Sequence, residues 1–90
     1  MGIPKNVCSN DPLNAGRGTT ITLQNHTGTD VTVSDCDRIG CSWPFVSPKS
    51  PFTIVAGGSQ DAILREITGS YCYCTIGCPR DTNPKTVIIS

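Results

Sequence analysis

The chain has 90 residues, of which seven are basic and seven acidic, so its formal net charge is zero. This length accommodates one domain with a limited hydrophobic core, which is only marginally stable without further support. A neutral chain without a basic stripe is a poor partner for phosphate groups, which argues against nucleic acid binding. The apolar runs are also too short to span a membrane.

In chain order, residues 1–18, "MGIPKNVCSNDPLNAGRG", combine Pro, Asn, Asp and Gly without hydrophobic periodicity. They predict a flexible N-terminal arm that carries Cys8. Residues 19–25 and 31–35 alternate apolar and polar positions on either side of the turn-like "NHTGTD". This pattern predicts a β-hairpin.

The remaining segments also favour short strands. Strand-like runs occupy residues 51–56, 62–67, 70–76 and 85–90, and helical periodicity is weak even in "SQDAILREIT". We therefore predict an all-β fold in which residues 19–90 form a single domain. Its expected architecture is a small, disulfide-stabilised antiparallel β-sandwich of the Greek-key or jelly-roll type.

The cysteines are the strongest compositional signal, and there are six of them: Cys8, Cys36, Cys41, Cys72, Cys74 and Cys78. An even count in a short chain predicts a disulfide framework, for which fifteen pairings are possible. Disulfides persist outside the reducing cytosol, so we expect an extracellular location or a cell or spore surface. The start "MGIPKNVCSN" has no basic region followed by an apolar run. We expect either that a signal was removed or that the protein leaves the cell by another route, such as lysis.

Strand geometry restricts the pairing. Cys72 and Cys74 lie two apart and share a face, with Cα atoms roughly 6.5 to 7 Å from each other, so each should pair elsewhere. Cys36 and Cys41 could bond to each other or reach residues 72, 74 or 78, and Cys8 could fold back or reach another molecule.

A zinc site formed by Cys36, Cys41, Cys74 and Cys78 is an alternative, but "CDRIGC" is longer than the usual zinc knuckle. A redox site would need Cys-x-x-Cys at a helix start. Copper binding through "CYC" is also disfavoured, because only one Met and one His in the chain could accompany it. We expect no metal and no cofactor.

No nucleophile, metalloprotease or phosphate-loop motif is present, and His26 is the only histidine. Asp35 and Asp37 are two apart, but turn aspartates more often cap local backbone groups than perform acid–base chemistry. The sequence therefore predicts a protein that is not an enzyme.

Two surface features raise a binding question. In "WPFVSPKSPF", a loop with Trp43, Phe45, Lys49 and Phe52 could present an aromatic patch to a protein or glycan, or Trp43 could instead plug the core. "NHT" makes Asn25 a possible glycosylation site.

The segment "CYCTIGC" at 72–78, after "TTITLQN" and "FTIVAGGSQDA", resembles the subunits of bacterial endospore appendages. The resemblance implies a small jelly-roll protein that stacks into fibres and needs no signal peptide. It also implies that Cys8 on the arm bridges to Cys72, Cys74 or Cys78 of a neighbouring subunit. This chain departs from the family in its shorter length and in the single cysteine of its arm.

The leading hypothesis is thus a structural protein that self-assembles through Cys8 into a disulfide-cross-linked fibre or surface appendage. The alternative is a monomeric secreted binding or defence protein, such as a hydrolase inhibitor, toxin or lectin-like module, with three internal disulfides. A zinc-stabilised intracellular module is the third class.

Overall fold

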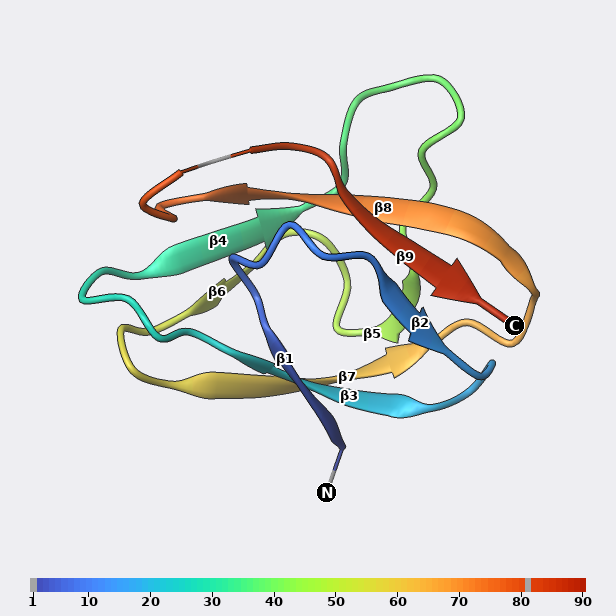
Figure 1. Ribbon diagram of the computed structural model, residues 1–90, viewed down its shortest axis with the longest axis horizontal. Coiled ribbons are helices and arrows are strands. Elements are labelled where there is room, and N and C mark those ends of the chain that lie inside the picture. The colour runs from blue at the N-terminus through green and yellow to red at the C-terminus, as the bar shows by residue number, and fades with distance from the viewer. Residues whose placement is uncertain (1, 81) are drawn as a thin grey trace.

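The computed structural model describes residues 2–80 and 82–90, and this part of the chain contains β-strands and no helix (Figure 1). The strands are β1 (Ile3–Asn6), β2 (Leu13–Ala15), β3 (Thr20–Gln24), β4 (Val31–Ser34), β5 (Phe45–Ser47), β6 (Phe52–Ile54), β7 (Ser59–Leu64), β8 (Gly69–Ile76) and β9 (Lys85–Ile89). The predicted all-β fold is therefore confirmed.

The strands form two sheets, one with the order β1-β3-β7-β5 and the other with the order β2-β9-β8-β4-β6. The chain changes sheet at every connection except the one between β8 and β9, which pair directly in antiparallel register. Both sheets are mixed, because β1 runs parallel to β3 and β2 runs parallel to β9. This corrects the prediction of a purely antiparallel arrangement.

The predicted hairpin between residues 19–25 and 31–35 is wrong, although both strands exist. β3 pairs with β1 and β7, whereas β4 pairs with β6 and β8 in the other sheet. Each strand buries two aliphatic side chains, Ile21 and Leu23 on β3 and Val31 and Val33 on β4. A hairpin within one sheet and a crossing between two sheets would both bury these apolar faces in one core. Periodicity alone could not choose between the two.

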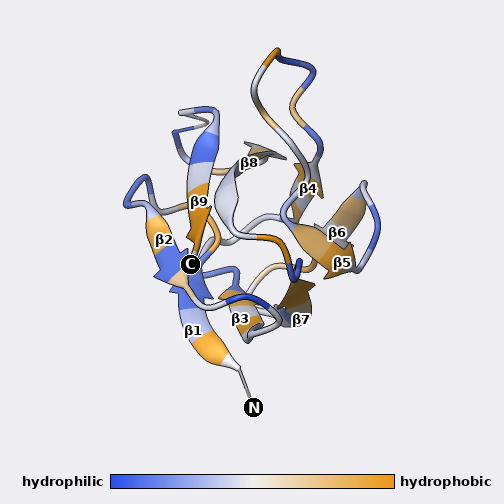
Figure 2. Ribbon diagram, turned by 90° about the vertical axis from the view of Figure 1, so that its right-hand side faces the viewer, coloured by the Kyte–Doolittle hydropathy of each residue, from blue (hydrophilic) through white to orange (hydrophobic). Residues whose placement is uncertain are grey.

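The buried apolar residues of both sheets form one cluster. Its fully buried members include Leu64, Val87 and Tyr73. Tyr73 is the largest of them, and its hydroxyl donates a hydrogen bond to the Val7 carbonyl at 3.1 Å. Figure 2 shows the alternation of hydrophilic and hydrophobic residues along the strands that enclose this core.

The flexible arm predicted for residues 1–18 is not confirmed, because two strands of this segment pair with the body of the protein. Leu13 and Ala15 of β2 are buried beside β9. Pro4 lies in β1 at the edge of its sheet, where a residue without an N–H group is tolerated. Both strands are so short that neither produces a detectable alternation in the sequence.

Side chains also tie down the connection between β1 and β2. Lys85, which is 2 % exposed, donates from Nζ to Asn10 Oδ1 at 3.0 Å. Lys5 donates from Nζ to the Asp11 carbonyl at 2.6 Å. Partial burial lowers the pKa of Lys5, the nearby Lys85 lowers it further, and the charge of Asp11 opposes the shift. The N-terminal segment is thus an integral part of the fold.

Replacing Tyr73→Phe tests the buried hydroxyl. We expect a loss of about 1–2 kcal/mol at pH 7, because the Val7 carbonyl loses its donor. Burial raises the pKa of Tyr73 well above its usual value. The tyrosine of the unfolded chain releases its proton at about pH 10, while that of the folded protein keeps it. The stability that Tyr73 contributes is therefore complete below that pH and declines above it.

The measurement is chemical denaturation of both proteins between neutral and alkaline pH. The difference in unfolding free energy should stay constant up to about pH 9 and shrink above about pH 10. A difference that does not change with pH would show that the hydroxyl is not protected from ionisation by the fold.

Candidate functional site: a loop clasped by two disulfides

All six cysteines form disulfides within the chain, as the sequence predicts for a disulfide framework. The pairs are Cys8–Cys78, Cys36–Cys74 and Cys41–Cys72, with Cα–Cα distances of 5.6, 5.3 and 5.4 Å. These distances lie within the usual range for disulfides. The expectation that Cys72 and Cys74 pair with different partners is confirmed.

The first disulfide concerns the Cys8 hypothesis directly. Cys8, which follows β1, is bonded to Cys78 of its own chain, two residues beyond β8. In this structure Cys8 therefore has no free thiol with which to bridge to another subunit. An intermolecular link through Cys8 would require that disulfide to open or exchange.

β8 separates the aromatic core from the other two disulfides. Tyr71 and Tyr73 of this strand belong to the core cluster. Cys72 and Cys74 occupy the alternate positions, which place them on the opposite face of the strand. From there they bond to Cys41 and Cys36 in the connection between β4 and β5.

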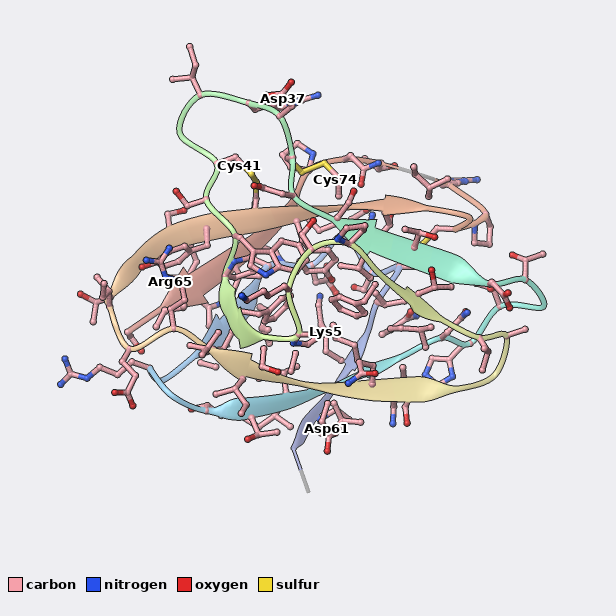
Figure 3. All side chains as sticks on the ribbon, turned by 180° about the vertical axis from the view of Figure 1, so that it is seen from behind. Lys5, Asp37, Cys41, Asp61, Arg65 and Cys74 are labelled. Carbon is pink, nitrogen blue, oxygen red and sulfur yellow. A yellow bond between two sulfur atoms is a disulfide. The ribbon has the colours of Figure 1, made fainter. Side chains whose placement is uncertain are left out.

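Residues 36–41, "CDRIGC", are therefore held at both ends on one strand, and we call them the clasped loop. Figure 3 shows it standing away from β8, with Asp37 on the projecting part and the disulfide sulfurs near Cys41 and Cys74 at its base. Asp37, Arg38, Ile39 and Gly40 are all exposed.

Backbone hydrogen bonds fix the shape of this loop. The Arg38 N–H donates to the Cys36 carbonyl at 2.8 Å, and the Cys41 N–H donates to the Arg38 carbonyl at 3.3 Å. Gly40 has a φ of 83°, in the left-handed region that glycine adopts without steric cost. The loop thus closes as a tight turn between its two cysteines.

The segments that flank the clasped loop are also bonded to the body of the protein. The Cys72 N–H donates to the Ser42 carbonyl at 3.1 Å, which adds a backbone contact beside the Cys41–Cys72 disulfide. On the other side, the Asp35 N–H donates to Ser50 Oγ at 2.7 Å. The loop is consequently a fixed projection with an exposed tip.

The tip itself carries an unusual combination of side chains. Ile39 is 107 % exposed, and the tip of the β4–β5 connection has the colour of a hydrophobic residue in Figure 2. Across residues 2–80 and 82–90, no hydrogen bond or ion pair engages the guanidinium of Arg38. No pattern within "DRIG" predicts a site, and the flanking cysteines are the sequence signal that marks this segment.

The same cysteines bear on the zinc alternative. The Sγ atoms of Cys36, Cys41 and Cys72 lie within 4.8 Å of one another, close enough to hold an ion. Each of these sulfurs is bonded to a second sulfur, however, and only a thiolate is an effective ligand. The oxidised structure therefore offers no zinc site at these cysteines.

The aromatic residues proposed as a binding loop pack together at the edge of the core. The Trp43 ring packs edge-on against Phe45 and Phe52, with ring centroids 5.2 and 6.0 Å apart. Its Nε1 donates a hydrogen bond to the Pro48 carbonyl at 3.2 Å. Phe45 is 3 % exposed. These rings pack against one another and against the core, and of the four predicted residues Lys49 is the exposed one.

Asn25, the predicted glycosylation site, is 1 % exposed. Its Nδ2 donates to the carbonyls of Thr29 at 2.8 Å, Ile54 at 3.0 Å and Val55 at 3.2 Å. Its Oδ1 accepts from the Thr27 N–H at 2.9 Å, as in an Asx turn. A glycan on Nδ2 is incompatible with these contacts, and the "NHT" segment instead supports the crossing from β3 to β4.

Comparison with protein-family models, with curated proteins and with solved structures finds no match to this chain. No pocket is found in the surface formed by the described residues. In the same part of the chain there is no helix with the length and apolar character that crossing a membrane requires.

Replacing Asn25→Ala should lower the unfolding free energy by about 2–4 kcal/mol, since one buried and two part-buried carbonyls lose their donor at once. Asn14→Ala is the matched control, because Asn14 is exposed on β2 and its loss should change stability by less than about 0.5 kcal/mol. Denaturant unfolding of the three proteins measures both effects. Equal stability of the two variants would contradict a structural role for Asn25.

Proposed function

We propose that the protein is a secreted, non-enzymatic, cysteine-rich binding protein that contacts another macromolecule through the clasped loop. The observation that carries this proposal is that two disulfides hold the ends of one exposed loop on a single strand. The proposal corresponds to the monomeric alternative considered from the sequence.

The chemistry of the cysteines supports an extracellular location. Three disulfides are typical of extracellular proteins, because intracellular thiol systems keep most cysteines reduced. A domain of this size also gains stability from them. In the chain-entropy account, a bridge that closes a loop as long as that of Cys8–Cys78 contributes about 4 kcal/mol.

The way in which the loop is held supports a binding role. A surface segment loses conformational freedom when a partner binds, and that loss weakens the complex. In the clasped loop most of this freedom is already removed by the Cys36–Cys74 and Cys41–Cys72 disulfides. Arginine is enriched among the residues that dominate binding energy, and Arg38 lies exposed at the tip.

The second candidate is the self-assembling fibre subunit implied by the sequence resemblance. The observation in its favour is that both sheets are open and have edge strands. These are β1 and β5 in one sheet and β2 and β6 in the other. Edge strands can pair with another chain. The cross-link through Cys8 on which the hypothesis relied would first have to replace the bond to Cys78.

A gel of the native protein with and without reductant separates the two candidates. We expect a monomer in both lanes and an intact mass lower than that of the reduced chain by two hydrogens for each of three disulfides. The Cys8→Ser/Cys78→Ser variant should remain monomeric and lose about 2–4 kcal/mol of stability. A ladder that collapses on reduction and disappears in this variant would support the fibre instead.

The binding role is tested by capture from an extracellular fraction on three immobilised proteins. These are the wild type, the loop variant Asp37→Gly/Arg38→Gly/Ile39→Gly, and the control Lys49→Ala. We expect at least one protein to be retained by the wild type and the control but lost on the loop variant. Identical capture by all three would contradict a contact through the loop, provided that intact masses show three disulfides in each.

A further inference from the structure

We propose that the clasped loop is a substrate-like inhibitor of serine proteases that cleave after arginine, with Arg38 entering the specificity pocket. This inference rests on the proposed binding function and names the class of partner. The bond presented to the protease is the peptide bond between Arg38 and Ile39.

The first argument is the chemistry of Arg38. Its guanidinium is exposed and, within residues 2–80 and 82–90, forms no hydrogen bond or ion pair. A charged group held in this way can enter a pocket without breaking an intramolecular contact. A pocket that ends in a carboxylate matches it, since guanidinium and carboxylate groups form paired, charge-assisted hydrogen bonds. Trypsin-like proteases carry such a carboxylate in the pocket that sets their specificity.

The second argument excludes binding to phosphate groups as the role of this arginine. Arg38 is a single cation beside Asp37, in a chain whose net charge is zero. Binding to a phosphate backbone requires several basic residues that act together. One arginine at the tip of a projection instead fits recognition in a single deep pocket.

The third argument is the residue that follows. Ile39 is 107 % exposed, and a single exposed aliphatic residue requires no special explanation by itself. Next to Arg38 in a fixed projection, however, it supplies apolar surface on the other side of the presented bond. Burial of this side chain against a partner would favour binding, because it removes apolar surface from water.

The backbone at the presented bond also permits attack. The Arg38 carbonyl accepts one hydrogen bond, from the Cys41 N–H at 3.3 Å. A carbonyl oxygen has two lone pairs, so the second remains for the N–H groups that stabilise the oxyanion in a serine protease. Neither neighbouring disulfide covers this bond, because both join the base of the loop to β8.

Cleavage of this bond would proceed as ordinary peptide hydrolysis. The protease serine oxygen attacks the Arg38 carbonyl carbon, and the bond to the Ile39 nitrogen breaks as that nitrogen takes up a proton. Water then releases the acyl group, leaving a carboxylate on Arg38 and an amino group on Ile39.

The clasp determines what happens after such a cut. The Arg38 side remains bound through Cys36–Cys74 and the Ile39 side through Cys41–Cys72, so both new ends stay on the same strand. Two groups held this close behave as if present at very high local concentration, which favours resynthesis of the bond. A segment without this constraint would separate and leave the protease, whereas the clasped loop remains in the active site.

The experiment titrates trypsin with the full oxidised chain and measures hydrolysis of a small arginine substrate, with chymotrypsin as the specificity control. We expect an inhibition constant for trypsin below about 1 μM, in the range that pre-organised protease inhibitors reach. Chymotrypsin, whose pocket is hydrophobic, should be unaffected.

Three variants locate the effect. Arg38→Ala should raise the inhibition constant by about 100-fold or more, as for a dominant interface residue. Arg38→Lys should retain inhibition because it keeps the positive charge, and Lys49→Ala should match the wild type. The Cys36→Ser/Cys74→Ser variant keeps Arg38 but loses one side of the clasp. It should be cleaved at Arg38–Ile39, which the intact mass shows as an increase of one water. Its inhibition of trypsin should then decline with time.

The outcomes separate this inference from the proposed function. If trypsin is not inhibited, or if the wild type is simply digested at Arg38–Ile39, the inhibitor proposal is overturned. The proposed function still stands in that case if the glycine variant of the loop loses a captured extracellular protein. If the wild type neither inhibits trypsin nor captures a loop-dependent partner, both proposals fail.

Discussion

The alternation of side chains along β8 is the constraint on which the rest of the structure depends. At one set of positions the strand gives Tyr71 and Tyr73 to the core, and at the other it gives Cys72 and Cys74 to the disulfides that hold the clasped loop. A shift of one residue in the pairing of β8 would exchange these two sets. The core and the projecting loop therefore share a single register, which β9 and β4 fix from either side of the strand.

Two kinds of bond connect this strand to the N-terminal segment. The Tyr73 hydroxyl reaches the Val7 carbonyl within the core, and Cys78, just beyond β8, is bonded to Cys8. Parallel pairing of β1 with β3 and of β2 with β9 then distributes the segment between both sheets. What composition describes as a polar, glycine- and proline-containing arm is consequently held at several independent points.

The sequence alone predicted the all-β class, the disulfide framework and the separate partners of Cys72 and Cys74, since these depend on local alternation and on cysteine count. It did not predict which sheet each strand joins. β3 and β4 are both apolar on one face, so the sequence pattern is the same for a hairpin and for a crossing between sheets. The structure shows the crossing, in which Asn25 donates to the carbonyls of Ile54 and Val55 at the end of β6. The exposed loop was harder to predict for a similar reason. The flanking Cys36 and Cys41 mark the segment, but its exposure depends on their bonds to Cys74 and Cys72, which the sequence leaves open.

The repeated change of sheet has a consequence for how the chain reaches its structure. Among the described strands, β8 and β9 are consecutive and paired, and the other ladders join strands that are not consecutive. Almost every hydrogen-bonded ladder therefore joins segments that are far apart in sequence. Folds dominated by such distant pairing fold slowly, because long loops must close before any contact compensates for their entropy. The strand that β2 pairs with is β9, near the carboxyl end, and β4 needs β8 to become more than an isolated pair with β6. We therefore expect the chain to remain largely unfolded during synthesis until residues 85–89 have emerged, and to acquire its disulfides only after that point.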